Sequence, residues 1–326
     1  MPRLRPPLPA TALAELSDAQ GGAVSRRQVT NLGMTDDQIA RSLRRDWQPS
    51  GLPGVYLTFT GPVAHLSRCW TALLYAGTGA ALCLDTAAWI WGLRDEPPDD
   101  VHIMIVSDRR VKKQPGMRIH LRTHLPGRRH PARVPTVVRL EETVLDMADR
   151  ATPDEVIGLV LRACQRRLTT PDRIRSAADG RATMRHRQLV TDLLDEAVNG
   201  VQSTLERRYL HDVERAHGLP RGARNMAEEQ TSRRRYRDVR YLRYCLVVEL
   251  DGRAAHPQDR RELDDLRDND LLLDEGTRTL RYGWRSVAVH PCETAGQVVE
   301  LLRSGGWDGA PRHCSANCRL PQPDGR

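Results

Sequence analysis

A chain of 326 residues is too long for one ordinary hydrophobic core, so two or three domains are expected. Its net charge of +8 at pH 7 favours an acidic polymer such as nucleic acid as a partner, because phosphate contacts release counterions. The seven cysteines form no regular disulfide framework and no secretory signal precedes the first expected helix, which argues against a secreted protein and favours the cytoplasm.

Two capping boxes follow each other near the amino terminus. Ser25 is followed three residues later by Gln28, and Thr35 by Gln38, so each pair can satisfy free N–H groups at the start of a helix. Gly33 lies between them and permits a tight turn. The pattern predicts two short helices that begin after residues 25 and 35 and form a helix-turn-helix.

The second of these helices is expected to bury one face and to present arginines on the other. Ile39 and Leu43 are four residues apart and should face inward, and a Pro/Gly hairpin in residues 48–59 would form a wing. The predicted DNA-contacting residues are Arg26, Arg27, Arg41, Arg44 and Arg45. Two alternatives remain: a helical bundle whose arginines are merely solvated, and a winged helix that binds protein.

Residues 1–60 also resemble the amino-terminal domain of AbiEi-type antitoxins. The resemblance is carried by GGAVSRRQVTNLGMTDDQIARSLRR in residues 21–45 and LPGVYLT in residues 52–58. It implies a regulatory or antitoxin-like role, with a cognate toxin as a possible partner.

The middle of the chain reads as a mixed α/β domain over residues 61–135 and a helical connector over residues 136–200. The apolar stretch of residues 72–93 contains Asp85 and three glycines, so a buried helix, a break and a second helix are expected rather than a membrane span. Residues 101–107 and 117–124 read as strands. Thr152 and Thr170 are expected to cap connector helices.

Residues 201–310 are predicted to form an α/β sandwich. A helix should begin at Ser203 and end near Gly218, and strands should follow over residues 233–241 and 245–252. A helix over residues 258–274, a strand over residues 279–284 and a last helix over residues 292–303 complete the pattern.

Acidic residues gather on the expected strand pair. Asp238 precedes Glu249 by eleven positions, enough for two adjacent strands, and Asp251 shares a strand face with Glu249. Clustered carboxylates repel each other unless a divalent cation such as Mg²⁺ or Mn²⁺ neutralises them, and such an ion can activate water against a phosphodiester. His256 could act as a general base or acid.

The stretch of residues 203–307 resembles the very-short-patch-repair-endonuclease-like family of the PD-(D/E)XK nuclease fold. The matching pieces are STLERRYL, RYRDVRY, VVELDGRAAHP, LRDND and TLRYGW. The resemblance implies a nuclease site at Asp238, Glu249 and Asp251, with His256 and Glu206 contributing. Asp251 stands where the superfamily has a lysine, so the metal, His256 or an arginine such as Arg253 would have to supply positive charge.

Each of these residues also has an interpretation without catalysis. Glu206 would close a capping box with Ser203, and the strand acids would pair with nearby arginines, which are Arg235, Arg237 and Arg240. In the expected tail of residues 311–326, His313, Cys314 and Cys318 form only a weak zinc pattern with Cys292, and disorder is expected.

The sequence therefore predicts a multi-domain α+β protein, with a winged helix-turn-helix in front, a mixed α/β middle and a restriction-endonuclease-like domain behind. The predicted function is DNA binding joined to a Mg²⁺-dependent endonuclease. The alternative is an AbiEi-like regulator whose nuclease fold is inactive. No membrane association is expected, and no oligomeric state is indicated.

Overall fold

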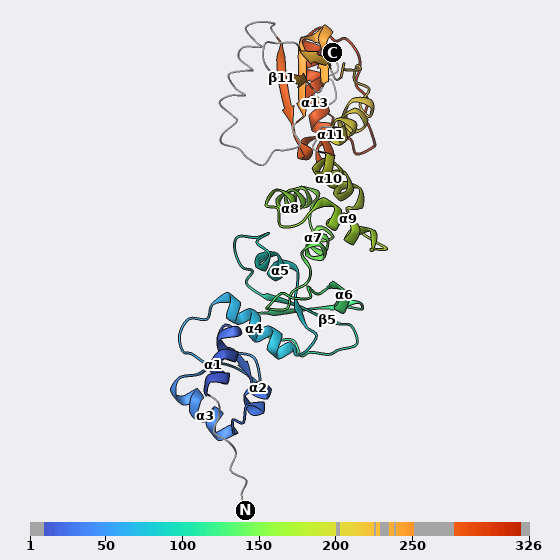
Figure 1. The fold of residues 1–326 in the computed structure, drawn as a ribbon. Helices are drawn as coiled ribbons and strands as arrows, with labels where there is room; N and C mark the ends of the chain where they lie inside the picture. Colours follow the sequence, from blue (N-terminus) through green and yellow to red (C-terminus); the bar gives the residue numbers. More distant parts are fainter. Residues whose placement is uncertain are drawn as a thin grey trace, which may run out of the picture. The chain divides into compact units, whose positions relative to one another are not determined.

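The computed structural model describes residues 10–199, 203–224, 226–228, 235–237, 239–250 and 277–320. The chain is a mixed α/β protein with several small sheets, as predicted (Figure 1). It divides into two compact units. Unit 1 comprises residues 1–150 and 166–169, and unit 2 comprises residues 151–165 and 170–326. The expected domain boundaries at residues 60, 135, 200 and 310 stay predictions.

Unit 1 opens with the helix-turn-helix and its wing. The elements are α1 (Ala10–Ala19), β1 (Ala23–Ser25), α2 (Arg26–Asn31), α3 (Asp36–Arg45), β2 (Gln48–Pro49) and β3 (Val55–Leu57). The strands form an antiparallel sheet in the order β1-β3-β2. This succession of three helices and a three-stranded sheet, with a hairpin after α3, is the arrangement of a winged helix.

Both predicted capping boxes are present. The Ser25 hydroxyl accepts from the backbone N–H of Gln28 and the Thr35 hydroxyl from that of Gln38, and each Gln side chain accepts from the N–H of its cap residue. Gly33 has φ 101°, so the turn between α2 and α3 uses a conformation that favours glycine. The small core beneath α3 contains Val24, Val29, Met34, Ile39 and Trp47, with Leu43 packed against it.

A second sheet follows in unit 1. The elements of this part are α4 (His65–Ala76), β4 (Ala81–Leu82), α5 (Leu84–Ile90), β5 (Val101–Val106), β6 (Met117–Arg122), α6 (Leu125–Arg128) and α7 (Leu140–Ala148), and the three strands form the sheet. β5 is central, parallel to β6 and antiparallel to β4. The expected break in residues 72–93 is confirmed, with β4 inside it. Among the described residues, none of the helices has the length and apolar character needed to cross a membrane.

Unit 2 begins with three helices. They are α8 (Pro153–Gln165), α9 (Pro171–Asp179) and α10 (Arg187–Asn199), and α10 contacts both of the others. Thr152 and Thr170 cap α8 and α9, as predicted: each hydroxyl accepts from the backbone N–H three residues on.

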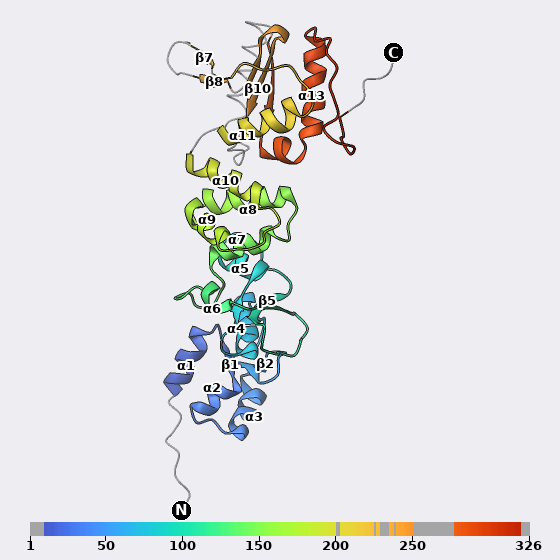
Figure 2. The ribbon, with the colours of Figure 1, turned by 90° about the vertical axis from the view of Figure 1, so that its right-hand side faces the viewer.

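The rest of unit 2 is built on a three-stranded sheet (Figure 2). Its elements are α11 (Ser203–Arg208), the π-helical η1 (Tyr209–Arg215), β7 (Met226–Glu228), β8 (Arg235–Arg237), β9 (Val239–Tyr241), the 3₁₀ turn η2 (Leu242–Tyr244), β10 (Leu246–Leu250), β11 (Arg278–Tyr282), the π-helical η3 (Arg285–Val289) and α13 (Pro291–Ser304). β10 is central, antiparallel to β9 and parallel to β11, while α13 contacts β11 and η1.

The structure corrects the expected elements of this part in two places. The helix that begins at Ser203 becomes π-helical from Tyr209. The single strand expected over residues 233–241 is described as β8 and β9, and β8 pairs with β7, a strand the sequence did not suggest. The expected helix over residues 258–274 lies outside the described residues.

A buried polar network fixes η1 against β9. Oε2 of Glu214 accepts from the Tyr241 hydroxyl at 3.1 Å, from Nη2 of Arg224 at 2.8 Å and from the backbone N–H of Gly222 at 3.2 Å. The hydroxyls of Tyr209 and Tyr241 lie 3.1 Å apart. Burial raises the pKa of both tyrosines, so they are neutral donors and acceptors. The carboxylate of Glu214 is thus buried with partners, as such a charge requires.

Candidate functional site

Glu249 is the member of the predicted acidic strand pair that the structure describes. It lies near the carboxyl end of β10, where its neighbours Val248 and Leu250 are buried and its own side chain is half-buried. Its register partner in the parallel pair is Arg281 of β11. Nε of Arg281 donates to Oε2 of Glu249 at 2.9 Å, and each side chain keeps about a third of its surface exposed. The acid inside an apolar strand is therefore balanced by a guanidinium.

Arg281 was missed in the sequence, where only cations close to the acids along the chain were considered. The parallel pairing of β10 with β11 brings it beside Glu249 from 32 residues away. The strand expected over residues 279–284 contains this arginine, but the sequence does not show which strand lies beside it.

The structure describes only one of the other predicted catalytic residues, Glu206. Asp238, Asp251 and His256 lie outside the described residues. Val239, at the start of β9, is the register partner of Val248, so this end of β9 lies next to the part of β10 that carries Glu249. Glu206 lies in the first turn of α11 and is half-buried. α11 contacts α10, η1 and η3, and a role for Glu206 in catalysis stays a prediction.

The five predicted DNA-contacting arginines are all exposed on the helix-turn-helix. Arg26 forms an ion pair of 2.5 Å with Asp36, which links α2 to α3 on the surface. Arg41, Arg44 and Arg45 are spaced three and four residues apart, so they share the face of α3 opposite the buried Ile39. Among the described residues, no acidic side chain forms an ion pair with Arg27, Arg41, Arg44 or Arg45. Their charges are available to a polyanion.

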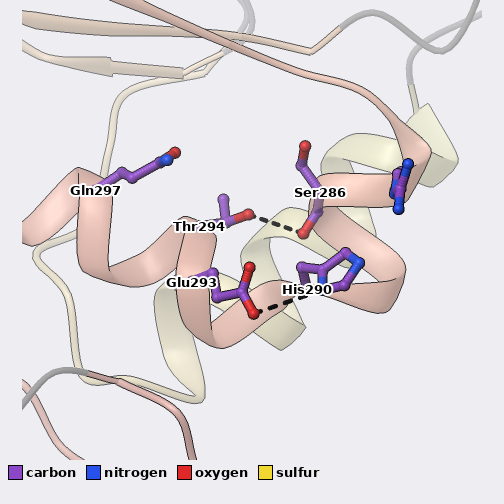
Figure 3. A pocket seen from close by; sticks show the side chains of 6 residues that line it. Ser286, His290, Glu293, Thr294 and Gln297 are labelled. Carbon is purple, nitrogen blue, oxygen red and sulfur yellow. Dashed lines mark hydrogen bonds and ion pairs between the residues drawn. The ribbon is translucent and has the colours of Figure 1, made fainter.

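A polar pocket of about 320 Å³ lies between η3 and the start of α13 (Figure 3). It is lined by Arg285, Ser286, His290, Glu293, Thr294 and Gln297. Two of its ionisable side chains lie beside acids: Nε of Arg285 lies 3.1 Å from Oδ1 of Asp154, and Nδ1 of His290 lies 3.6 Å from Oε1 of Glu293. The Arg285–Asp154 contact links η3 to α8, and the His290–Glu293 contact lies within the start of α13.

The arrangement around Glu249 places a carboxylate and a guanidinium side by side at the surface of the sheet. A carboxylate oxygen is a ligand that Mg²⁺ accepts, and a neighbouring guanidinium can stabilise negative charge on a phosphoryl group. Glu249 is only one such ligand, so a complete metal site requires the acids outside the described residues.

Comparison with known proteins finds a solved structure of low similarity. No protein-family model and no curated protein matches the chain. A similar solved structure is that of the RV2827C protein from Mycobacterium tuberculosis, with 16% sequence identity and a TM-score of 0.38 over 59% of this chain and 77% of that one. A likeness at this level carries no argument about the fold or the function.

Proposed function

We propose that this chain is a DNA-binding protein whose winged helix places α3 in the major groove of duplex DNA. The observation that carries the proposal is the exposed face of α3 with Arg41, Arg44 and Arg45, opposite a packed core. The second helix of a helix-turn-helix is the element that enters the groove, and arginine is suited to phosphate and to guanine edges. The net charge of +8 favours association with the same polyanion.

A gel-shift series with a matched control tests this proposal. The variant Arg44→Ala with Arg45→Ala removes two adjacent charges from α3. The control, Lys112→Ala with Lys113→Ala, removes two adjacent exposed charges from the same unit outside the winged helix. The α3 variant is expected to lose most of its affinity for a pool of random-sequence duplexes, while the control keeps it. Equal losses in both would indicate attraction by overall charge and contradict a role for α3.

We propose further that unit 2 is a nuclease-like domain that hydrolyses phosphodiester bonds with Mg²⁺ or Mn²⁺. Support comes from Glu249 on the central strand of a mixed sheet, held 2.9 Å from Arg281. Glu249 would hold the ion together with Asp238 and Asp251, and His256 would move the proton. The ion, when bound, polarises the scissile phosphate and activates water. Arg281 would stand in for the missing lysine by facing the negative charge that develops on the phosphate.

Cleavage of supercoiled plasmid separates this activity from its alternative. Wild type is expected to nick the plasmid only with Mg²⁺ or Mn²⁺, and Glu249→Gln and Asp238→Ala to abolish nicking without loss of DNA binding. If wild type and both variants give the same background, the chain is not this enzyme. Retained gel shifts at selected sequences would then favour an AbiEi-like regulator with a cognate toxin.

A further inference from the structure

Four residues with metal-binding side chains meet in unit 2, at a place distinct from Glu249. They are His217, two residues after η1, Cys292 in the first turn of α13, and Cys314 and Cys318 in the segment that follows α13. One nitrogen or sulfur atom of each lies within 4.8 Å of the corresponding atoms of the other three. The sequence suggested three of these residues only weakly. It missed His217, which is 97 positions from Cys314, and offered His313, which is not in the cluster.

The sulfur atoms are spaced as ligands of one ion. Sγ of Cys292 lies 3.6 Å from Sγ of Cys314 and 3.6 Å from Sγ of Cys318. Three thiolates at about 2.3 Å from a tetrahedral zinc ion have sulfurs about 3.8 Å apart. A disulfide needs about 2.05 Å, and all three cysteines are free.

His217 is prepared to be the fourth ligand. Its side chain is fully buried, and Nδ1 lies 3.0 Å from the carbonyl oxygen of Val213, to which it can only donate. That bond leaves Nε2 with its lone pair. Nε2 is buried and has no hydrogen-bond partner among the described residues, and a nitrogen of this ring lies within 4.8 Å of each of the three sulfurs. A histidine whose other nitrogen donates to a backbone carbonyl is the usual orientation of a metal ligand, and a buried nitrogen without a partner is otherwise costly.

The segment that supplies two of the ligands is held in place. Where disorder was expected from residue 311, the structure describes residues 311–320 against the end of η1. The backbone N–H of Arg312 donates to the carbonyl oxygen of His217 at 2.9 Å, and Nη2 of Arg312 donates to that of Arg215 at 2.6 Å. Beyond the cluster, the N–H of Leu320 donates to Sγ of Cys318 at 3.4 Å, and the Leu320 side chain is buried.

We propose that His217, Cys292, Cys314 and Cys318 bind one zinc ion in a structural site that fastens the segment after α13 to the start of α13 and the end of η1. Three sulfurs and one nitrogen fill a tetrahedral shell, so no position is left for water or substrate and the ion has no catalytic role. Sulfur-rich tetrahedral sites select zinc over the hard cations that suit carboxylates. This site is independent of the proposed nuclease activity.

Metal analysis of the purified full chain tests the zinc site directly. Elemental analysis is expected to find about one zinc ion per chain. The double variant Cys314→Ser with Cys318→Ser is expected to retain less than about a tenth of it, because two of the four ligands are gone. The control is Cys245→Ser, which removes an exposed thiol outside the cluster and should keep the full amount.

A second measurement decides the matter if the double variant does not fold. Wild-type protein reconstituted with Co²⁺ is expected to show sulfur-to-cobalt charge transfer and the intense visible bands of a tetrahedral site. Wild-type protein that carries no metal after purification under reducing conditions would overturn the proposal. The same holds if its three cysteines react as free thiols or form a disulfide with one another. Iron in place of zinc would overturn the metal assignment.

Discussion

Glu249 and Arg281 face each other across the parallel pair β10–β11, with 2.9 Å between Oε2 and Nε. Both side chains remain about one-third exposed, so solvent screens the attraction. A pair of this kind contributes little to folding, although Glu249 lies on the central strand of the sheet. The proposal that Glu249 binds a ligand therefore requires that the pair adds little to the stability of the fold.

The first prediction concerns that ion pair. Glu249→Gln and Arg281→Gln are each expected to change the free energy of unfolding by less than about 1 kcal/mol, because solvent reaches both side chains and screens their attraction. Urea unfolding followed by circular dichroism measures the change. A loss of several kcal/mol from either substitution would show that the pair is structural, and the argument for a ligand site at Glu249 would then fall.

The buried network around Glu214 gives a contrasting prediction. Tyr241→Phe removes a hydroxyl that donates to Glu214 and leaves that carboxylate with one donor fewer inside the protein. A cost of about 1–3 kcal/mol is expected. The control is Tyr56→Phe in the winged helix, a half-buried tyrosine that should cost less. Hydrogen exchange of β9 and η1 localises the effect, and unchanged exchange in both elements would contradict it.

The capping boxes predict a local loss in the winged helix. Thr35→Ala removes the hydroxyl that accepts from the Gln38 N–H, and is expected to cost about 1 kcal/mol. Thr30→Ala, at an exposed position of α2, serves as the control. Hydrogen exchange of peptides covering α3 reports the difference. Equal protection of α3 in the two variants would show that the cap does not hold the helix.

A pair of histidines in unit 1 predicts a pH dependence of stability. Burial lowers the pKa of His120 to about 4, with positive charge from Arg150 adding to the effect, and burial also lowers the pKa of His102. The two rings lie 5.2 Å apart. Between about pH 6.5 and 4 the unfolded chain therefore binds more protons than the folded chain. The free energy of unfolding is expected to be highest above about pH 6.5 and to fall as the pH drops toward about 4. His120→Gln should flatten this slope, whereas the exposed His124→Gln should not. An unchanged slope in His120→Gln would contradict the assignment.

Local signals in the sequence were sufficient where the structure depends on neighbours along the chain. The caps at Ser25, Thr35, Thr152 and Thr170 and the continuous apolar strand at residues 101–106 are short-range patterns, and each lies where it was expected. The face of Ile39 was predicted for the same reason, since helical spacing fixes it.

Contacts between distant residues could not be predicted in this way. Arg281 meets Glu249, and His217 meets Cys314, only because strands and helices pack in a particular order. The π-helical geometry of η1 and η3 has no sequence signature that we recognised. The prediction of disorder after residue 310 was wrong for residues 311–320, because composition does not reveal a segment that is held by backbone hydrogen bonds.

The most direct test of the central claim is the affinity of the full chain for duplex DNA as salt is raised from about 50 to 200 mM. If α3 contacts phosphates, the logarithm of the association constant falls linearly with the logarithm of the salt concentration. The triple variant Arg41→Ala, Arg44→Ala, Arg45→Ala is then expected to have a less steep slope, by about 0.9 for each phosphate that α3 no longer neutralises. Wild type and triple variant with the same affinity and the same slope would contradict DNA binding through the winged helix.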